Sequence, residues 1–176
     1  MRKALVVGIN NYGGQNALNG CINDAESISS LLARNENGEV NFTVKKKLDT
    51  QSKSDLSGLI RECFSGDEDV ALFYFSGHGY LDTLGGYIVT PDCQQYNMGV
   101  SMQEILNIVN SSKCRSKVVI LDCCHSGSMG SVQTAGQQLA AIGDGVTRFA
   151  RCTRLGIYPP PCTPPPRLPI CLPCPC

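Results

Sequence analysis

The chain has 176 residues, and its fifteen Lys and Arg residues balance fifteen Asp and Glu residues, so the formal net charge is zero. A neutral chain of this length suits one domain and has no general attraction for nucleic acid or an anionic membrane, so we expect neither as a partner. No apolar run approaches the roughly 20 residues of a spanning helix. The apolar stretch after Met1-Arg2-Lys3 is also shorter than that of a signal peptide. We therefore expect a cytoplasmic protein.

Apolar runs and helical periodicities alternate along the first two thirds of the chain. Short apolar or alternating runs predict strands at 3–9, 41–45, 70–75 and 117–122. Apolar residues at helical spacing predict helices at 19–34, 50–63 and 101–109, the last with Ser101 and Glu104 placed as a capping box. A hairpin or loop is expected at 80–89. Strands that alternate with helices indicate βαβ units, so the fold class is α/β with a mainly parallel sheet covered on both faces.

The pattern weakens after Gly127. Residues 134–142 fit a helix, and residues 146–152 fit a fifth strand that Arg148 and Arg151 interrupt. Beyond Tyr158 we expect no regular structure.

The last part of the chain has a different composition. Nine of the ten prolines and five of the eleven cysteines lie after position 151, whereas the other six cysteines are scattered as free thiols would be. We therefore expect one domain over 1–146, followed by an irregular tail over 147–176. The abrupt change leads to the hypothesis that the domain is truncated, or read out of frame, after about Val146.

Two of the predicted parallel strands end in polar clusters. Ser76-Gly-His-Gly79 follows the strand at 70–75, and Asp122-Cys-Cys-His-Ser-Gly127 follows the strand at 117–122. In open α/β sheets, chemistry gathers beyond the carboxyl ends of the strands. A thiol needs an imidazole near it in space to become a strong nucleophile. His78 meets this condition better than His125, because residues adjacent in sequence near a strand end point apart.

These motifs resemble those of the metacaspases, and more broadly the bacterial caspase-like cysteine peptidases. The resemblance rests on Ser-Gly-His-Gly, on Asp-x-Cys-His-Ser-Gly and on Leu18-x-Gly-Cys-x-Asn-Asp-Ala25, and it covers about 1–127. It implies a three-layer αβα sandwich, with further strands expected after Gly127. It also implies that Cys124 is the nucleophile, that His78 is the general base and later acid, and that the amides of Gly79 and Cys124 form the oxyanion hole.

The resemblance also implies a substrate preference. It places Asp122 and Asp24 in the S1 pocket, with Cys21 and Ser76 on its wall. Two carboxylates in one cleft favour a cationic side chain, so we expect peptide or protein substrates that are cleaved after Arg or Lys. An inactive caspase-like adaptor or pseudoenzyme is the alternative. The oligomeric state is left open.

We expect no cofactor and no metal site. Many metacaspases are activated by calcium through a dense acidic segment after the His-Gly pair, but this chain has only Asp82 and Asp92 there. Cys171 and Cys174 have the spacing of zinc ligands, but no second pair of ligands accompanies them.

Overall fold

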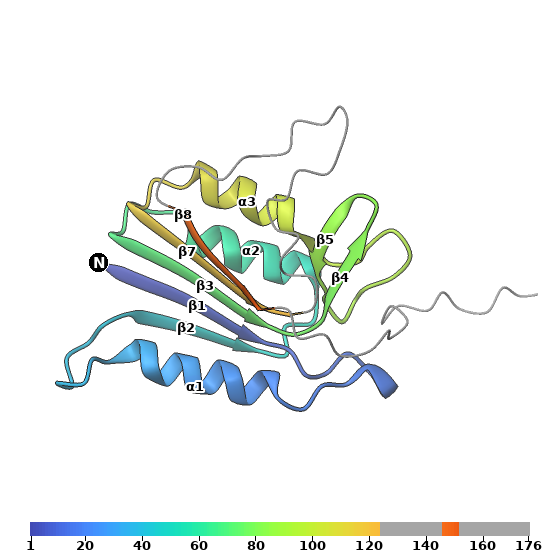
Figure 1. The fold of residues 1–176 in the computed structure, drawn as a ribbon, viewed down its shortest axis with the longest axis horizontal. Coiled ribbons are helices and arrows are strands. Elements are labelled where there is room, and N and C mark those ends of the chain that lie inside the picture. The colour runs from blue at the N-terminus through green and yellow to red at the C-terminus, as the bar shows by residue number, and fades with distance from the viewer. Residues whose placement is uncertain (124–145, 152–176) are drawn as a thin grey trace, which may run out of the picture.

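A parallel five-stranded sheet forms the centre of the molecule. The computed structural model describes residues 1–123 and 146–151, and the sheet has the strand order β2-β1-β3-β7-β8 (Figure 1). All four pairings between neighbouring strands are parallel. The strands are β1 (Arg2–Gly8), β2 (Thr43–Leu48), β3 (Val70–Ser76), β7 (Ser116–Asp122) and β8 (Val146–Arg151).

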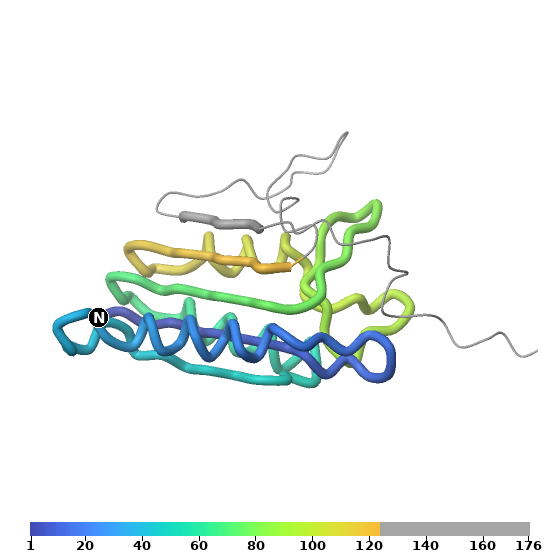
Figure 2. Tube along the Cα trace, turned by 60° about the horizontal axis from the view of Figure 1, so that its bottom comes forward, coloured from blue at the N-terminus to red at the C-terminus, as the bar shows by residue number. Residues whose placement is uncertain are grey.

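Helices cover both faces of this sheet. Helix α1 (Cys21–Ala33) contacts β1, β2 and β3 on one face, whereas α2 (Lys53–Cys63) and α3 (Met102–Ser111) lie on the other face (Figures 1 and 2). The three-layer αβα arrangement predicted from the sequence is therefore confirmed. The predicted helices and the first four predicted strands all form, with shifts at their ends.

A smaller antiparallel sheet rises beyond the carboxyl end of β3. It contains β4 (Gly79–Asp82), β5 (Gly85–Ile88) and the short β6 (Val100–Ser101) in that order. The first two strands form the predicted hairpin, and the amide of Val89 donates to the carbonyl of His78 at 2.9 Å. This hydrogen bond closes the base of the hairpin, because it joins Val89, which follows β5, to His78, which precedes β4.

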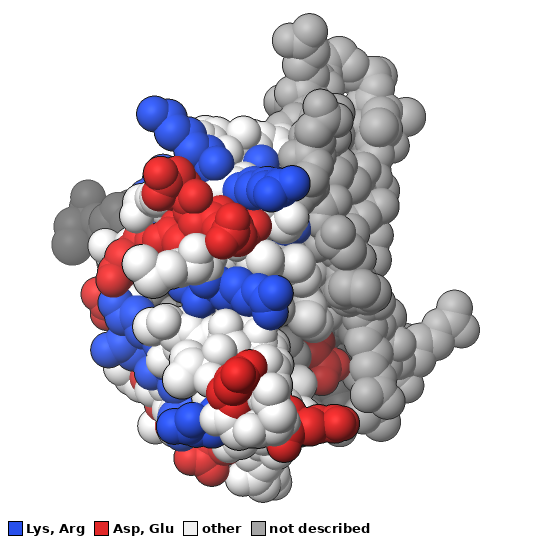
Figure 3. Space-filling view, turned by 90° about the vertical axis from the view of Figure 1, so that its left-hand side faces the viewer, with Lys and Arg blue, Asp and Glu red and all other residues white. Residues whose placement is uncertain are grey.

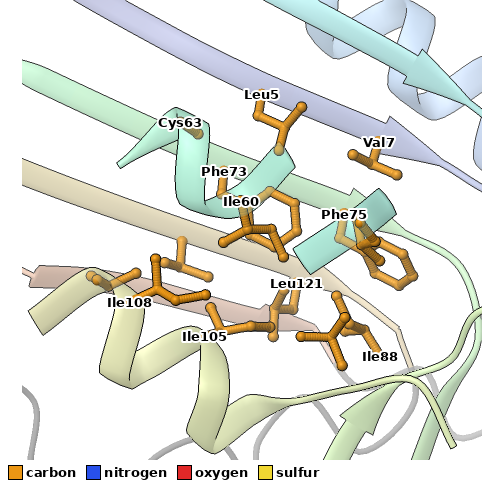
Figure 4. Close-up of a cluster of buried hydrophobic side chains, with 14 of the residues drawn as sticks. Leu5, Val7, Ile60, Cys63, Phe73, Phe75, Ile88, Ile105, Ile108 and Leu121 are labelled. Atoms are coloured by element: carbon orange, nitrogen blue, oxygen red, sulfur yellow. The ribbon is translucent and has the colours of Figure 1, made fainter. Parts of the chain in front are cut away.

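The core is divided by the alternation of side chains along the strands. Leu5, Phe73, Phe75 and Leu121 point toward α2 and α3, where they form the larger apolar cluster together with Ile60, Ile105 and Ile108 (Figure 4). A smaller cluster under α1 contains Ala4, Val6, Ala25, Leu72 and Tyr74. The two helices over the larger cluster begin at serine caps.

The predicted cap of α3 is present in part. The side chain of Ser101 accepts a hydrogen bond from the amide of Glu104 at 3.0 Å. The carboxylate of Glu104 does not return to that cap, because it accepts from Ser57 of α2 and pairs with Arg61 at 3.2 Å. The contact therefore joins α2 to α3.

Charges of both signs mix over the amino-terminal ends of the strands. Figure 3 views this end of the molecule and shows Lys and Arg side chains interspersed with Asp and Glu side chains. The terminal amine pairs with Asp69 at 2.8 Å, and Lys3 pairs with Glu68 at 2.9 Å. On edge strand β2, Lys45 and Lys46 are exposed and each pairs with a glutamate, as expected for a solvated edge.

The predictions for the cysteines and for the last part of the chain have different outcomes. The strand predicted at 146–152 forms as β8 (Val146–Arg151) and pairs with β7. Cys21, Cys63, Cys114 and Cys123 are free thiols, but Cys93 is disulfide-bonded, so that part of the free-thiol expectation is wrong. The helix at 134–142 and the tail from 152 lie outside the described residues. No helix within the described ranges is long and apolar enough to cross a membrane.

Candidate active site

Three strands deliver one row of residues to the carboxyl edge of the sheet. Gly8 of β1 is the register partner of Ser76 of β3, and Ser76 is the partner of Asp122 of β7. All three lie on the α1 face, because Phe75 and Leu121, the neighbours of Ser76 and Asp122, belong to the opposite face. The first predicted polar cluster, at Ser76, therefore lies beside the first residue of the second cluster, Asp122, at this edge.

The first turn of α1 lies directly over this row. A Cβ atom at Gly8 would collide with the carbonyl oxygen of Cys21 and would lie 2.8 Å from the Cβ of Ala25. Only glycine leaves room for so close an approach of the helix to the strand. The approach brings Cys21 and Asp24 onto the row, and the hydroxyl of Ser76 donates to the carboxylate of Asp24 at 3.4 Å.

Two carboxylates act on the same small region of this edge. Burial raises the pKa of the Cys21 thiol above its ordinary value; a hydrogen bond with Ser76 opposes this, and the charges of Asp24 and Asp122 raise it further. Burial, followed by the charges of Asp122 and Asp24, likewise raises the pKa of Tyr74 to about 12. The four residues expected in the substrate pocket, Cys21, Asp24, Ser76 and Asp122, thus lie together in an acidic environment.

The imidazole of His78 has a defined orientation. Its Nε2 atom lies 2.8 Å from the backbone carbonyl oxygen of Asn16. A carbonyl oxygen only accepts, so Nε2 must donate its proton to Asn16. In the neutral ring this leaves Nδ1 as the acceptor nitrogen.

Tyr12 also holds His78. Its hydroxyl oxygen accepts the backbone N–H of His78 at 2.9 Å, and the two rings lie 4.5 Å apart between centroids at an angle of 59°. Tyr12 lies in the loop after β1, and Asn16 ends the short 3₁₀ helix η1 (Gly14–Asn16) that follows it. The one signal for Tyr12 was an aromatic residue inside Asn-Asn-Tyr-Gly-Gly. The sequence held no such signal for Asn16, because its contact with His78 is made by its backbone carbonyl.

The remaining predicted residues have mixed outcomes. Gly79 follows His78 directly and begins β4. Cys123 is 4% exposed and packs in the core on the α2 and α3 face. Cys124 and His125 lie outside the described residues, so the place of the nucleophile stays a prediction.

The two acidic residues after the His-Gly pair accept hydrogen bonds in a turn and at the start of a helix. Asp82 accepts the amides of Leu84 and Gly85 within the hairpin turn. Asp92 accepts the amide of Lys53 at the start of α2 and the hydroxyl of Thr90. Within residues 1–123 and 146–151, no group of three or more His, Cys, Asp or Glu side chains is arranged to hold a metal.

Comparisons with known proteins agree with this architecture. The family model of the caspase domain, peptidase C14, matches residues 1–154. Metacaspase-1 of Schizosaccharomyces pombe is 31% identical over 145 residues, and metacaspase-1 of Scheffersomyces stipitis is 33% identical over 149 residues. Metacaspase-2 of Trypanosoma brucei brucei is 30% identical over 149 residues. Each alignment covers 72% of this chain but only 34%, 36% and 42% of those proteins, so the chain spans about a third to two fifths of their length.

A solved structure supports the fold alone. Protein GSU0716 from Geobacter sulfurreducens superposes with a TM-score of 0.54 and 22% sequence identity. The match covers 69% of this chain and 50% of that one.

Proposed function

Because the chain belongs to the caspase-domain family, peptidase C14, we propose that it is a cysteine endopeptidase that cleaves peptide bonds after Arg or Lys. The observation that carries the proposal is the orientation of His78. Its Nε2 proton is held by the carbonyl of Asn16, at the same sheet edge where β7 ends at Asp122, two residues before Cys124. An oriented base and a thiol at one edge are the two parts that thiol catalysis requires.

The tautomer of His78 defines its role. No described residue forms a hydrogen bond with Nδ1, so this nitrogen is available to take the proton of the Cys124 thiol. The resulting imidazolium stays oriented, because its Nε2–H still donates to Asn16. Cys124 and His78 therefore act as a dyad, and the carbonyl of Asn16 holds the ring.

The reaction then proceeds in two balanced halves. The thiolate of Cys124 attacks the scissile carbonyl carbon, and the amides of Gly79 and Cys124 stabilise the oxyanion that forms. The imidazolium of His78 gives its proton to the leaving amine, which leaves a thioester on Cys124. As water attacks the thioester carbon, His78 takes one proton from the water and passes it to the departing sulfur of Cys124, which restores the thiol. The carboxylic acid that forms releases its proton to solvent and leaves as the carboxylate. These groups move every proton required, so no resident cofactor is proposed.

The acidic pocket supplies the substrate preference. Ser76 donates to the carboxylate of Asp24 and is the register partner of Asp122, so both carboxylates lie near one residue of this edge. In agreement, after burial, both charges raise the pKa values of Cys21 and Tyr74. A guanidinium or ammonium group entering that region would be attracted, whereas a carboxylate would be repelled. This favours Arg or Lys at P1 and disfavours Asp.

The test compares three proteins on three substrates. Fluorogenic peptides with Arg, Lys or Asp at P1 are given to the wild type, to Cys124→Ala and to His78→Ala. We expect turnover of the Arg and Lys peptides by the wild type, a fall of about 10²–10⁴-fold in His78→Ala, and none in Cys124→Ala. Preferred cleavage after Asp would contradict the pocket assignment.

The alternative function, an inactive caspase-like adaptor, predicts a different result. Wild type and both variants would then show the same background rate on all three peptides. Because an adaptor keeps the same fold, thermal unfolding would not separate the two functions; only turnover and the reactivity of Cys124 would.

A further inference from the structure

Tyr12 closes a ring of contacts around the backbone of His78. Its hydroxyl oxygen accepts the amide of His78 at 2.9 Å and donates to the carbonyl of Val89 at 3.4 Å. The amide of Val89 in turn donates to the carbonyl of His78 at 2.9 Å. Burial raises the pKa of the Tyr12 phenol far above its ordinary value, so the hydroxyl keeps the proton it donates.

The glycine before His78 makes room for this hydroxyl. A Cβ atom at Gly77 would collide with the Tyr12 hydroxyl and lie 2.6 Å from the ring of Phe75. The first glycine of Ser-Gly-His-Gly is therefore required by Tyr12 as well as by the core. A tyrosine that served only as packing would not need its hydroxyl at this point.

The loop that presents Tyr12 is itself held at several points. The carboxylate of Asp49, after β2, accepts the amides of Asn10 and Asn11 at 2.8 and 3.0 Å. The side chain of Asn10 accepts the amide of Cys21 at 3.0 Å, and its carbonyl accepts the amide of Leu18 at 2.8 Å. The loop is thus fixed to β2 and to the start of α1, and it presents Tyr12 and the Asn16 carbonyl as one unit.

We infer that Tyr12 is a positioning residue for His78, and that its hydroxyl and ring hold the imidazole in the orientation in which Nε2 donates to Asn16 and Nδ1 stays available as a base. The inference rests on the proposed function, because it takes His78 as the base. Asn16 fixes one edge of the ring through Nε2. Tyr12 fixes the backbone from which the ring extends and packs against the ring at 4.5 Å between centroids.

Tyr12→Phe tests the inference, because it keeps the ring and removes only the hydroxyl. Tyr96→Phe is the matched control, because Tyr96 is 95% exposed. We expect Tyr12→Phe to lower kcat about tenfold with KM within about twofold, since a misplaced base slows the chemical step more than binding. Tyr96→Phe should match the wild type.

A second measurement does not depend on turnover. The rate at which iodoacetamide alkylates Cys124 is followed against pH, with the Cys124 peptide resolved by mass spectrometry from those of the other cysteines. A thiol assisted by an imidazole reacts at lower pH than a free thiol. In Tyr12→Phe this reactivity should move toward the profile of His78→Ala, whereas in Tyr96→Phe it should stay that of the wild type.

The outcomes separate the two proposals. If His78→Ala retains wild-type turnover and alkylation, the proposed function fails. If His78→Ala loses both while Tyr12→Phe retains wild-type kcat and alkylation profile, the proposed function stands and the role of Tyr12 is overturned. Should Tyr12→Phe not fold, amide exchange in the wild type decides. Slow exchange at the His78 amide, with the proton on Nε2, supports the inference, and a freely exchanging amide overturns it.

Discussion

The two faces of the central sheet are built from the same strands but differ in content. On the α2 and α3 face, the side chains remain apolar to the ends of the strands, through Phe75, Leu121 and Cys123. On the α1 face, the apolar cluster is smaller and gives way at the carboxyl edge to Ser76 and Asp122. On β3 and β7, one residue near the end of the strand therefore packs in the core, and the next residue belongs to the polar edge.

This difference shows how a small domain keeps packing and chemistry apart. A strand changes face at each residue, so Phe75 packs against the helices while the hydroxyl of Ser76 donates to the carboxylate of Asp24. Substitutions on the first face should change stability, whereas polar substitutions on the second should change activity. Five expected outcomes test that division, from the largest effect to the smallest.

The largest effect is expected from Phe73→Ala, which empties a fully buried site in the larger cluster (Figure 4). We expect the free energy of unfolding to fall by about 3–5 kcal/mol, since the transfer and cavity costs add. Phe42→Ala is the matched control on the α1 face, where Phe42 is only partly buried and should cost roughly half as much. Urea unfolding measures both. Equal losses would show that the two faces contribute alike.

The proposed preference for Arg and Lys predicts that Asp122→Asn lowers kcat/KM for Arg and Lys peptides about 10- to 100-fold, because one of the two charges proposed to face the substrate cation is lost. The free energy of unfolding should change by less than about 0.5 kcal/mol, since the residue is half-buried at a strand end. Asp24→Asn and the double variant complete a cycle. If both carboxylates contact one cation, the effects on kcat/KM will be non-additive. Strict additivity would place them in separate sites.

Gly8→Ala should destabilise the protein by about 1–3 kcal/mol, because the added Cβ collides with the Cys21 backbone and forces α1 away from the sheet. Activity should fall with it, because α1 carries Asp24. Gly58→Ala in α2 is the matched control: its Cβ meets nothing within 4 Å, and alanine in a helix should stabilise by about 0.5–1 kcal/mol. Thermal unfolding distinguishes them, and a Gly8→Ala protein as stable as the wild type would refute the close approach.

The smallest effect concerns one buried thiol on each face. Burial raises the pKa of Cys63 to about 12, and burial with the carboxylates of Asp24 and Asp122 raises that of Cys21. The folded chain therefore keeps protons that the unfolded chain releases. The contribution of these two thiols to the free energy of unfolding is complete below the pKa of an unfolded cysteine, about 8.5. It is lost as the pH rises toward the higher pKa values that the thiols have in the folded protein. Urea unfolding between pH 8 and pH 10 should show this fall.

The same thiols separate the faces by substitution. In Asp122→Asn, the pKa of Cys21 should decrease, because a neighbouring negative charge is gone, while that of Cys63 should not move. Alkylation against pH, resolved by peptide mass, measures both. A parallel shift at Cys63 would mean that the substitution loosened the whole fold.

Much of the fold followed from local pattern. The apolar run 70–75 and the run before Asp122 indicated buried strands in a chain that alternates them with helices, and a hairpin was one of the two structures expected after His78. The end positions were less predictable. The second strand begins at Thr43 rather than Asn41, because where pairing with β1 begins is decided by the partner strand and not by propensity.

The site divides in the same way. The side chains of Asp24, Ser76, His78 and Asp122 carried their own chemical signal, because carboxylate, hydroxyl and imidazole groups at strand and helix ends are seldom needed for packing. Tyr12 and Asn16 carried none that pointed to His78. A backbone carbonyl belongs to every residue, and a loop tyrosine has many possible partners.

The sequence alone thus determined the alternation of strands and helices, the polar clusters at two strand ends and the resemblance to the metacaspases, since these depend on residue type and spacing. Only the tertiary structure decided that Gly8, Ser76 and Asp122 form one row, that α1 lies close enough to add Asp24 to it, and that Tyr12 and Asn16 hold His78. These depend on strand register, which pairs Gly8 with Ser76, and on contacts between residues far apart in the chain, such as the hydrogen bond between Tyr12 and His78, which are 66 positions apart. Local sequence cannot specify such contacts, because they form only when the sheet assembles.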